Sequence, residues 1–308
     1  MSPRRKAPEG VTGIVDRARA TLFGVAVGDA LGATTEFMTP AGIRDRYGVL
    51  REIVGGGWLK LSPGQVTDDT EMTLCVARGI VCSRRWDPGP IADRFAHWLS
   101  GNPADVGATC RRGIEEYIEK GRIEAPPDEK GAGNGAAMRV APVALYTLGD
   151  EGLLSRLAVE QARITHNHPL SDAACETVGT MIQRGLLGAP PRDLMAAEEE
   201  LVARHPEFRS EGYDGNSSAY VVDTLRTVFD ALFSTDTFEE CVVKTVNRGG
   251  DADTTGSIAG AIAGARYGVA AIPQRWLEAL APDLREELSA LAEELVRKSP
   301  LFAGSSPR

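Results

Sequence analysis

The segment "GSIAGAIAGARYG" at residues 256–268 carries a glycine at every fourth position. The same spacing recurs in "GVAVGDALG" at residues 24–32, far away in the chain. On an α-helix, residues four apart share one face, so each glycine set removes a ridge of side chains and lets another backbone approach closely. Each glycine costs about 1 kcal/mol of helix propensity relative to alanine, which close packing must offset. Both helices are therefore predicted to lie in the core of an all-α protein.

The composition agrees with a helical protein and excludes several other classes. The chain has 308 residues, of which 43% are hydrophobic and only 6% aromatic, which favours packed helices over a β-sandwich. A net charge of −9, with no basic block beyond "PRRK" at residues 3–6, argues against a nucleic-acid binder. We find no signal peptide and no apolar stretch that could span a bilayer. Five scattered cysteines predict reduced thiols in a cytoplasmic protein and no cysteine-based zinc site.

Helical periodicity predicts one compact domain over residues 13–298, with flexible segments at 1–12 and 299–308. A short extended piece is expected at 55–65, and loops at 124–135 and 201–218. The predicted helices cover roughly residues 13–32, 69–83, 88–100, 106–120, 135–148, 152–164, 170–187, 191–203, 217–233, 237–247, 254–268 and 281–297.

Two of these helices open with acidic segments, "TDDT" at residues 67–70 and "DADT" at residues 251–254. Asp and Thr are favoured helix N-caps, so two separately capped helices are one reading. If the segments converge with Glu36, however, the carboxylates would repel one another unless cations were bound. Oxygen ligands from Asp, Glu and Thr suit Mg²⁺ or Mn²⁺. Asp29 lies two helical turns before Glu36 and is expected to share its face. Spacing alone supports the caps and the metal site about equally.

Six motifs follow one another from about residue 20 to about residue 277. They are "VGDALGATTEFMT", "PGQVTDDTEMTL", "NPADVGATCRRGI", "GAGNGAAMRVAP", "ARITHNHPLSDAA" and "VNRGGDADTTGSIAGAIAGARYGV". Together they make the chain resemble the ADP-ribosylglycohydrolases. The resemblance implies an all-α fold with two divalent cations, Mn²⁺ or Mg²⁺, at the bottom of a cleft. It implies metal ligands at Glu36, Thr67, Asp68, Asp69, Asp251, Asp253 and Thr254.

The resemblance also implies residues that bind ADP-ribose. A glycine turn before a helix can hold phosphate through its N–H groups, although such a turn is usually only a loop. The implied substrate-binding residues are Asp105, Gly133, Asn134, Gly135, Met138, Arg139, His166 and Tyr220.

Several of these residues have an alternative, purely structural reading. Arg139 fits an internal ion pair equally well, and Tyr220 fits a core tyrosine. The second histidine of "THNHP", His168, fits a cap for the helix that begins near residue 170 better than it fits a ligand. In close relatives we expect asparagine at the position that Ala108 occupies here. This difference affects how the loop positions the substrate, and it does not affect the metal site.

The implied reaction is hydrolysis of the N-glycosidic bond between ADP-ribose and an arginine side chain. Asp105, Glu36 and Asp68 are the candidates for catalytic carboxylates. The resemblance implies dinitrogenase reductase as the protein substrate, and a monomeric enzyme that a PII signalling protein recruits reversibly to the inner membrane. Two alternatives stay open: hydrolysis of another linkage, to serine or in free ADP-ribose derivatives, and a non-catalytic ADP-ribose-binding regulator. A metal-dependent phosphohydrolase is a weaker third reading.

Overall fold

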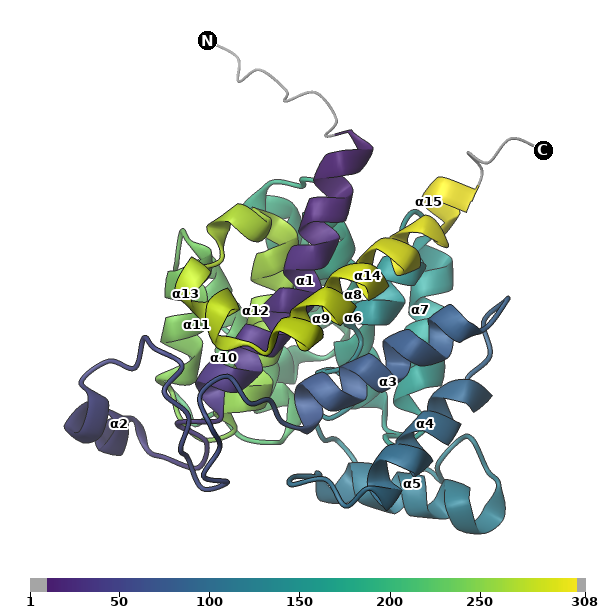
Figure 1. The fold of residues 1–308 in the computed structure, drawn as a ribbon, viewed down its shortest axis with the longest axis horizontal. Coiled ribbons are helices and arrows are strands. Elements are labelled where there is room, and N and C mark those ends of the chain that lie inside the picture. The colour runs from purple at the N-terminus through teal and green to yellow at the C-terminus, as the bar shows by residue number, and fades with distance from the viewer. Residues whose placement is uncertain (1–9, 304–308) are drawn as a thin grey trace.

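The computed structural model describes residues 10–303. Within that range it is a bundle of α-helices with two short 3₁₀ segments (Figure 1). The helices are α1 (Val11–Gly32), α2 (Pro40–Tyr47), α3 (Asp68–Cys82), α4 (Gly89–Ser100), α5 (Ala108–Lys120), α6 (Ala141–Tyr146), α7 (Glu151–Ala162), α8 (Pro169–Leu186), α9 (Pro191–Arg204), η1 (Pro206–Phe208), α10 (Val221–Phe233), α11 (Phe238–Val246), α12 (Ala252–Tyr267), η2 (Val269–Ala271), α13 (Gln274–Ala279), α14 (Pro282–Arg297) and α15 (Pro300–Ala303).

Helices α1 and α12 form the centre of the bundle and touch backbone to backbone. A Cβ built on Gly28 would lie 2.1 Å from the carbonyl oxygen of Gly256. One built on Gly24 would lie 2.0 Å from the carbonyl oxygen of Gly260. No side chain fits at these distances, so the glycines are required by the approach of the two helices. The predicted close packing of the glycine-ridged helices is confirmed.

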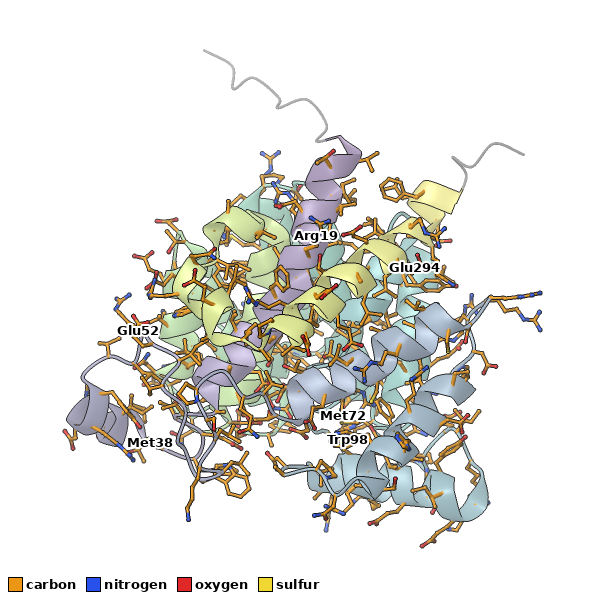
Figure 2. All side chains as sticks on the ribbon, viewed as in Figure 1. Arg19, Met38, Glu52, Met72, Trp98 and Glu294 are labelled. Carbon is orange, nitrogen blue, oxygen red and sulfur yellow. The ribbon has the colours of Figure 1, made fainter. Side chains whose placement is uncertain are left out.

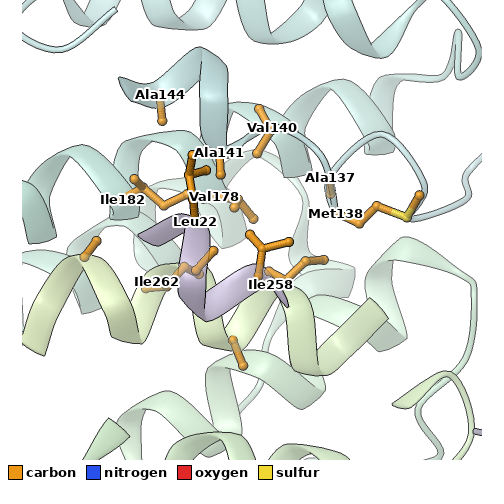
Figure 3. Close-up of a cluster of buried hydrophobic side chains, with 14 of the residues drawn as sticks. Leu22, Ala137, Met138, Val140, Ala141, Ala144, Val178, Ile182, Ile258 and Ile262 are labelled. Carbon is orange, nitrogen blue, oxygen red and sulfur yellow. The ribbon is translucent and has the colours of Figure 1, made fainter. Parts of the chain in front are cut away.

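The remaining helices enclose this pair with apolar side chains. Figure 3 shows Leu22 of α1 and Ile258 and Ile262 of α12 meeting Val178 and Ile182 of α8. All five side chains are at most 1% exposed. The charged side chains of Arg19, Glu52 and Glu294, which Figure 2 labels, lie on the outside of the bundle. The all-α fold class is confirmed.

The structure corrects several element boundaries. The predicted helix 135–148 forms an α-helix only at Ala141–Tyr146, because residues 135–139 are folded as turns around the glycine segment. The first helix ends at Gly32, so Glu36 lies in the turn that follows it and does not share a helical face with Asp29. The expected extended piece is reduced to an isolated bridge between Gly56 and Leu61.

The short helices α2, α13 and α15 were not predicted. The first two bury few side chains, Ile43 in α2 and Trp276 and Leu277 in α13. A pattern this short has no readable period, so only contact with the rest of the bundle defines these helices.

The predicted domain boundaries at residues 13 and 298 lie close to the ends of the described residues. Residues 1–9 and 304–308 lie outside the described residues, while α1 already begins at Val11 and α15 reaches Ala303. The domain limits of 13 and 298 and the flexible ends stay predictions. Among the helices of residues 10–303, none combines the length and apolarity needed to cross a bilayer.

Candidate metal and substrate site

The two acidic helix openings meet, although they are separated by most of the chain. The Thr254 hydroxyl at the start of α12 donates a hydrogen bond to Asp69 Oδ2 at the start of α3, at 3.1 Å. Glu36 approaches from the turn after α1. One carboxylate oxygen each of Glu36, Asp251 and Asp253 lie within 4.8 Å of one another. The crossing of α1 and α12, together with α3 packed beside them, therefore gathers carboxylates from three segments at one point.

The hydrogen bonds distinguish capping from metal binding. Asp251 is the N-cap residue of α12, but its side chain makes no capping hydrogen bond. Its Oδ2 instead accepts a hydrogen bond from Asn134 Nδ2 at 2.6 Å. At α3 the cap is Thr67, whose hydroxyl accepts the Asp69 N–H, so Asp68 and Asp69 are not needed as caps. The capping reading does not account for these aspartates.

A buried carboxylate oxygen tests whether the donor set fits a cation. Asp69 is fully buried, and its Oδ1 has no hydrogen-bond partner within the described part of the chain. Leaving such an acceptor unsatisfied costs about 1–3 kcal/mol or more. Several carboxylates and a hydroxyl, without histidine or cysteine, form the oxygen donor set that hard divalent cations prefer. The residues present therefore fit such ions.

Asp29 has a structural role beside the site. Its carboxylate accepts the backbone N–H groups of Thr67 at 3.0 Å and Thr70 at 3.1 Å, and the Thr70 hydroxyl at 2.5 Å. These bonds tie the first turn of α3 to the last turn of α1. Asp29 thereby positions Asp68 and Asp69 without belonging to the ligand set.

Burial and mutual repulsion raise the pKa values of the cluster. Burial, and then the nearby Asp105 carboxylate, raise the pKa of Glu36 and that of Asp68 to about 8 in each case. Burial and neighbouring carboxylates also hold the pKa values of Asp69 and Asp253 well above the usual range. Without cations, the folded protein therefore keeps protons on these groups that the unfolded chain would release.

The raised pKa values of the cluster determine the direction in which stability changes with pH. The folded pKa values lie above the unfolded ones, so the folded state binds more protons, and the free energy of unfolding of the metal-free protein falls as pH rises from about 4 towards about 8. In EDTA we expect a lower Tm at pH 8.5 than at pH 6. Added Mn²⁺ should raise Tm more at pH 8.5, because it binds the deprotonated cluster. A metal-free Tm that is constant or rises over this interval, measured by calorimetry, would contradict the cluster's electrostatics.

Above the cluster lies a cavity of about 690 Å³, within the size range of small-molecule sites. Most of the predicted site residues line it, whereas Thr67, Asp69 and Arg139 do not. The predicted residues in its lining are Glu36, Asp68, Asp105, Gly133, Asn134, Gly135, Met138, His166, Tyr220, Asp251, Asp253 and Thr254.

The glycine turn of the cavity is held in a fixed position. The Asn134 N–H donates to the Ala219 carbonyl at 3.1 Å, and the Val221 N–H donates to the Ala132 carbonyl at 3.0 Å. The Asn134 N–H is thus committed to the chain and not to a phosphate. A Cβ on Gly133 would lie 2.9 Å from His166 Nε2, and one on Gly135 would lie 2.7 Å from a cysteine sulfur. Glycine is required here so that the turn can pack on the histidine ring.

Arg139 lies behind the cavity and supports its wall. The guanidinium is fully buried and lies 4.5 Å from the centroid of the Phe95 ring, and no carboxylate of the described residues is within ion-pair distance. It donates to Gln161 and, at 2.8 Å, to the Thr165 hydroxyl. From the sequence, Arg139 was considered as a substrate-binding residue or as part of an internal ion pair. In the structure it forms no ion pair with a described residue and does not line the cavity. We therefore assign Arg139 a positioning role.

The same chain of bonds continues to His166. Thr165 Oγ1, which accepts from Arg139, lies 2.7 Å from His166 Nδ1. The other ring nitrogen, Nε2, lies beside the glycine turn. Burial, followed by the charge of Arg139, holds the pKa of His166 well below its usual value. His166 is therefore a neutral imidazole in the cavity wall.

Three further residues considered from the sequence are His168, Tyr220 and Asp105. His168 Nδ1 accepts the Leu170 N–H at 3.1 Å and caps α8, outside the cavity lining. Tyr220 is 43% exposed and borders the cavity at the start of α10, which excludes the core reading. Asp105 is half-buried in the lining, and burial raises its pKa, with the charge of Asp251 adding to the effect.

The lining residues that the sequence analysis did not identify include two aromatic ones, Phe37 and Trp58. Phe37 directly follows Glu36, and Trp58 directly follows the three glycines at residues 55–57. The signal available in the sequence was the position of Phe37 directly beside the candidate ligand Glu36.

Comparisons with known proteins agree with this geometry. The family model described as ADP-ribosylglycohydrolase matches residues 11–301. The ADP-ribosyl-[dinitrogen reductase] glycohydrolase of Rhodospirillum rubrum is 51% identical over 91% of this chain and 96% of its own length. The ADP-ribosylarginine hydrolase Tri1 of Pseudomonas putida is 31% identical over 93% of this chain and 79% of its own length. A solved structure entitled ADP-ribosylglycohydrolase-related protein complex superimposes with a TM-score of 0.84, at 38% identity, over 94% of this chain and 99% of that one. Because the family model spans nearly all of the sequence and these similarities run along its whole length, the chain belongs to the ADP-ribosylglycohydrolase family.

Proposed function

We propose that this protein is a metal-dependent hydrolase that removes ADP-ribose from an ADP-ribosylated arginine, with dinitrogenase reductase as its protein substrate. The observation that carries the proposal is the buried acidic cluster at the base of a cavity of about 690 Å³, whose ligand positions all hold oxygen donors. The 51% identity to the Rhodospirillum rubrum enzyme supports the same substrate. Cleavage of the linkage on dinitrogenase reductase would reactivate nitrogenase.

We propose two divalent cations, Mn²⁺ or Mg²⁺, as the cofactors. The residues that would hold them are Glu36, Thr67, Asp68, Asp69, Asp251, Asp253 and Thr254. When bound, such ions orient substrate oxygens and withdraw electron density from them.

The protein's own groups would orient the substrate and move the proton. Hydrolysis adds water across the C1″–N bond: the oxygen goes to C1″, and a proton goes to the departing guanidine nitrogen. Asp105 is our first candidate for that proton transfer, because it lines the cavity and is only half-buried, so water reaches it. Glu36 and Asp68 are the other candidates, but both lie within the cluster that would bind metal. His166 and the rigid glycine turn would hold the ADP-ribose.

The role of Asp105 can be tested by Asp105→Asn. Loss of a general acid or base typically lowers turnover by about 10²- to 10⁴-fold, and we expect a loss in that range with the Tm shift by Mn²⁺ retained. Wild-type turnover in this variant would remove Asp105 from the mechanism and leave Glu36 and Asp68.

The function itself is tested by the leaving group. Purified protein with Mn²⁺ is incubated with matched peptides that carry ADP-ribose on arginine or on serine, and with ADP-ribosylated dinitrogenase reductase. We expect release of ADP-ribose from the arginine peptide and from the reductase, none in EDTA, and little from the serine peptide. Preferential serine release would transfer the proposal to that linkage. Binding of ADP-ribose without release from any substrate would identify a regulator instead.

We also propose that the protein acts as a monomer in the cytoplasm and that a PII signalling protein recruits it reversibly to the inner membrane. The family resemblance alone supports these three statements. A pull-down with PII under ammonium-replete conditions should recover the protein, and recovery of nothing would count against this regulation. Light scattering checks the monomer.

A further inference from the structure

Two exposed aromatic side chains meet at the edge of the cavity. Phe37 is 67% exposed and Trp58 is 50% exposed, and their ring centroids are 5.5 Å apart with an interplanar angle of 53°. Both rings line the cavity that contains the acidic cluster. Large apolar side chains paired on a surface next to a polar site indicate a binding surface.

The backbone holds Phe37 in this position against its conformational preference. Its φ is +60°, in the left-handed region that bulky residues rarely adopt. The Phe37 N–H donates to the Gly250 carbonyl at 2.7 Å, and the Gly250 N–H donates to the Met38 carbonyl at 2.9 Å. This clamp joins the residue after Glu36 to the residue before Asp251. A strained residue maintained by neighbouring bonds motivates a functional reading.

Trp58 is tied to the same cluster through its ring nitrogen. Its Nε1–H donates to Glu36 Oε2 at 2.5 Å. Gly57 lets the loop approach closely, because a Cβ there would lie 2.1 Å from the Ala33 carbonyl oxygen. The indole therefore stays beside a carboxylate while half of its surface faces solvent.

Exposed aromatic faces favour a cation over an uncharged group. A guanidinium within about 6 Å of a ring centroid is attracted by the negative face of the ring. The pyrophosphate of ADP-ribose is an anion and suits the lining near Lys130 and the glycine turn instead. The scissile bond joins a ribose to a guanidinium, so its cationic side belongs on the aromatic pair.

We propose that Phe37 and Trp58 form the subsite for the arginine side of the substrate, with the guanidinium stacked on their rings. This inference rests on the proposed function and adds the residues that would distinguish arginine from uncharged leaving groups. The two rings would bind the substrate before the bond breaks, so they should affect KM more than kcat.

The test compares Phe37→Leu, which keeps an apolar side chain but removes the ring, with Leu187→Ala, an exposed apolar position (55% exposed) that is absent from the cavity lining. For the ADP-ribosyl-arginine peptide we expect Phe37→Leu to raise KM by about 3- to 10-fold, with kcat within about twofold, given the usual strength of cation–π contacts. The affinity for free ADP-ribose, which lacks the guanidinium, should change by less than about twofold. Phe37→Tyr, which keeps a ring, should recover most of the loss.

A binding measurement separates this inference from the proposed reaction. Agmatine supplies a guanidinium without ADP-ribose, and its affinity for the Mn²⁺- and ADP-ribose-loaded protein can be measured by calorimetry. We expect weak binding to the wild type that Phe37→Leu lowers by at least about threefold. If the wild type releases no ADP-ribose but agmatine binding depends on Phe37, the reaction is wrong and the subsite stands. The subsite would be overturned if the wild type binds no agmatine, if Phe37→Leu binds it as tightly as the wild type, or if Phe37→Leu weakens ADP-ribose and peptide binding equally.

Discussion

Asp253→Asn is expected to lower the release of ADP-ribose from ADP-ribosyl-arginine by more than about a hundredfold without unfolding the protein. Even partners that only orient metal ligands typically cost 10- to 100-fold when they are changed, and we place Asp253 among the ligands themselves. Its side chain is 2% exposed, and its pKa is raised by burial and then by Asp69, Asp251 and Glu36. Asparagine keeps the shape but removes one charge from this group.

The same variant should be at least as stable as the wild type when metal is absent. Removing one of several repelling carboxylates relieves the metal-free cluster, whereas the rise of Tm with Mn²⁺ should shrink. Calorimetry in EDTA and in Mn²⁺, beside initial rates, measures both effects. Asp45→Asn makes the same chemical change at an exposed position and should alter neither. Wild-type turnover with an unchanged Mn²⁺ shift in Asp253→Asn would exclude Asp253 as a ligand.

Gly260→Ala is expected to destabilise the protein by at least about 3 kcal/mol, near or beyond the upper end of the usual range for overpacking. The added Cβ would lie 2.1 Å from the carbonyl oxygen of Gly24 and 2.7 Å from its carbonyl carbon. These are backbone atoms, so the contact is relieved only by separating α1 from α12. The gain in helix propensity, about 1 kcal/mol, is smaller than this cost.

Gly152→Ala supplies the matched control. This glycine is also in a helix, but it is exposed, and its Cβ would have as its nearest neighbour Asp150 Oδ1 at an ordinary 3.6 Å. Its free energy of unfolding should stay the same or rise by up to about 1 kcal/mol. Urea denaturation of both variants measures the difference. A Gly260→Ala protein as stable as Gly152→Ala would mean that α1 and α12 do not pack through their glycines.

The long helices could be predicted because their signals are local. A helix such as α10 repeats its apolar positions over several turns, and the glycine spacing in α1 and α12 indicates a packing face directly. The signal fails where the segment is short or irregular. Residues 135–139 contain good helix formers, yet they turn, because the chain there is bonded to residues 219–221 and packs on His166. Local propensity cannot register such distant partners.

The site divides in the same way. The amino-acid types were informative alone: aspartates, a glutamate and threonines pointed to hard cations, and the six motifs pointed to the family. Two separately capped helices remained an equal reading, because nothing in the spacing tells whether residues 67–70 and 251–254 meet. Nor could spacing show that Arg139 acts on His166 through Thr165, or that Phe37 and Trp58 form a pair.

The sequence by itself therefore determined the helical class, the close helix pair and the chemistry of the candidate ligands, since each of these depends on residue type and on spacing within one segment. Only the tertiary structure decided which carboxylates share a centre, which one anchors a helix as Asp29 does, and which aromatic rings border the cavity. Those outcomes depend on electrostatic and hydrogen-bond contacts between segments that are distant in sequence. They exist only once the crossing of α1 and α12 has brought the segments together.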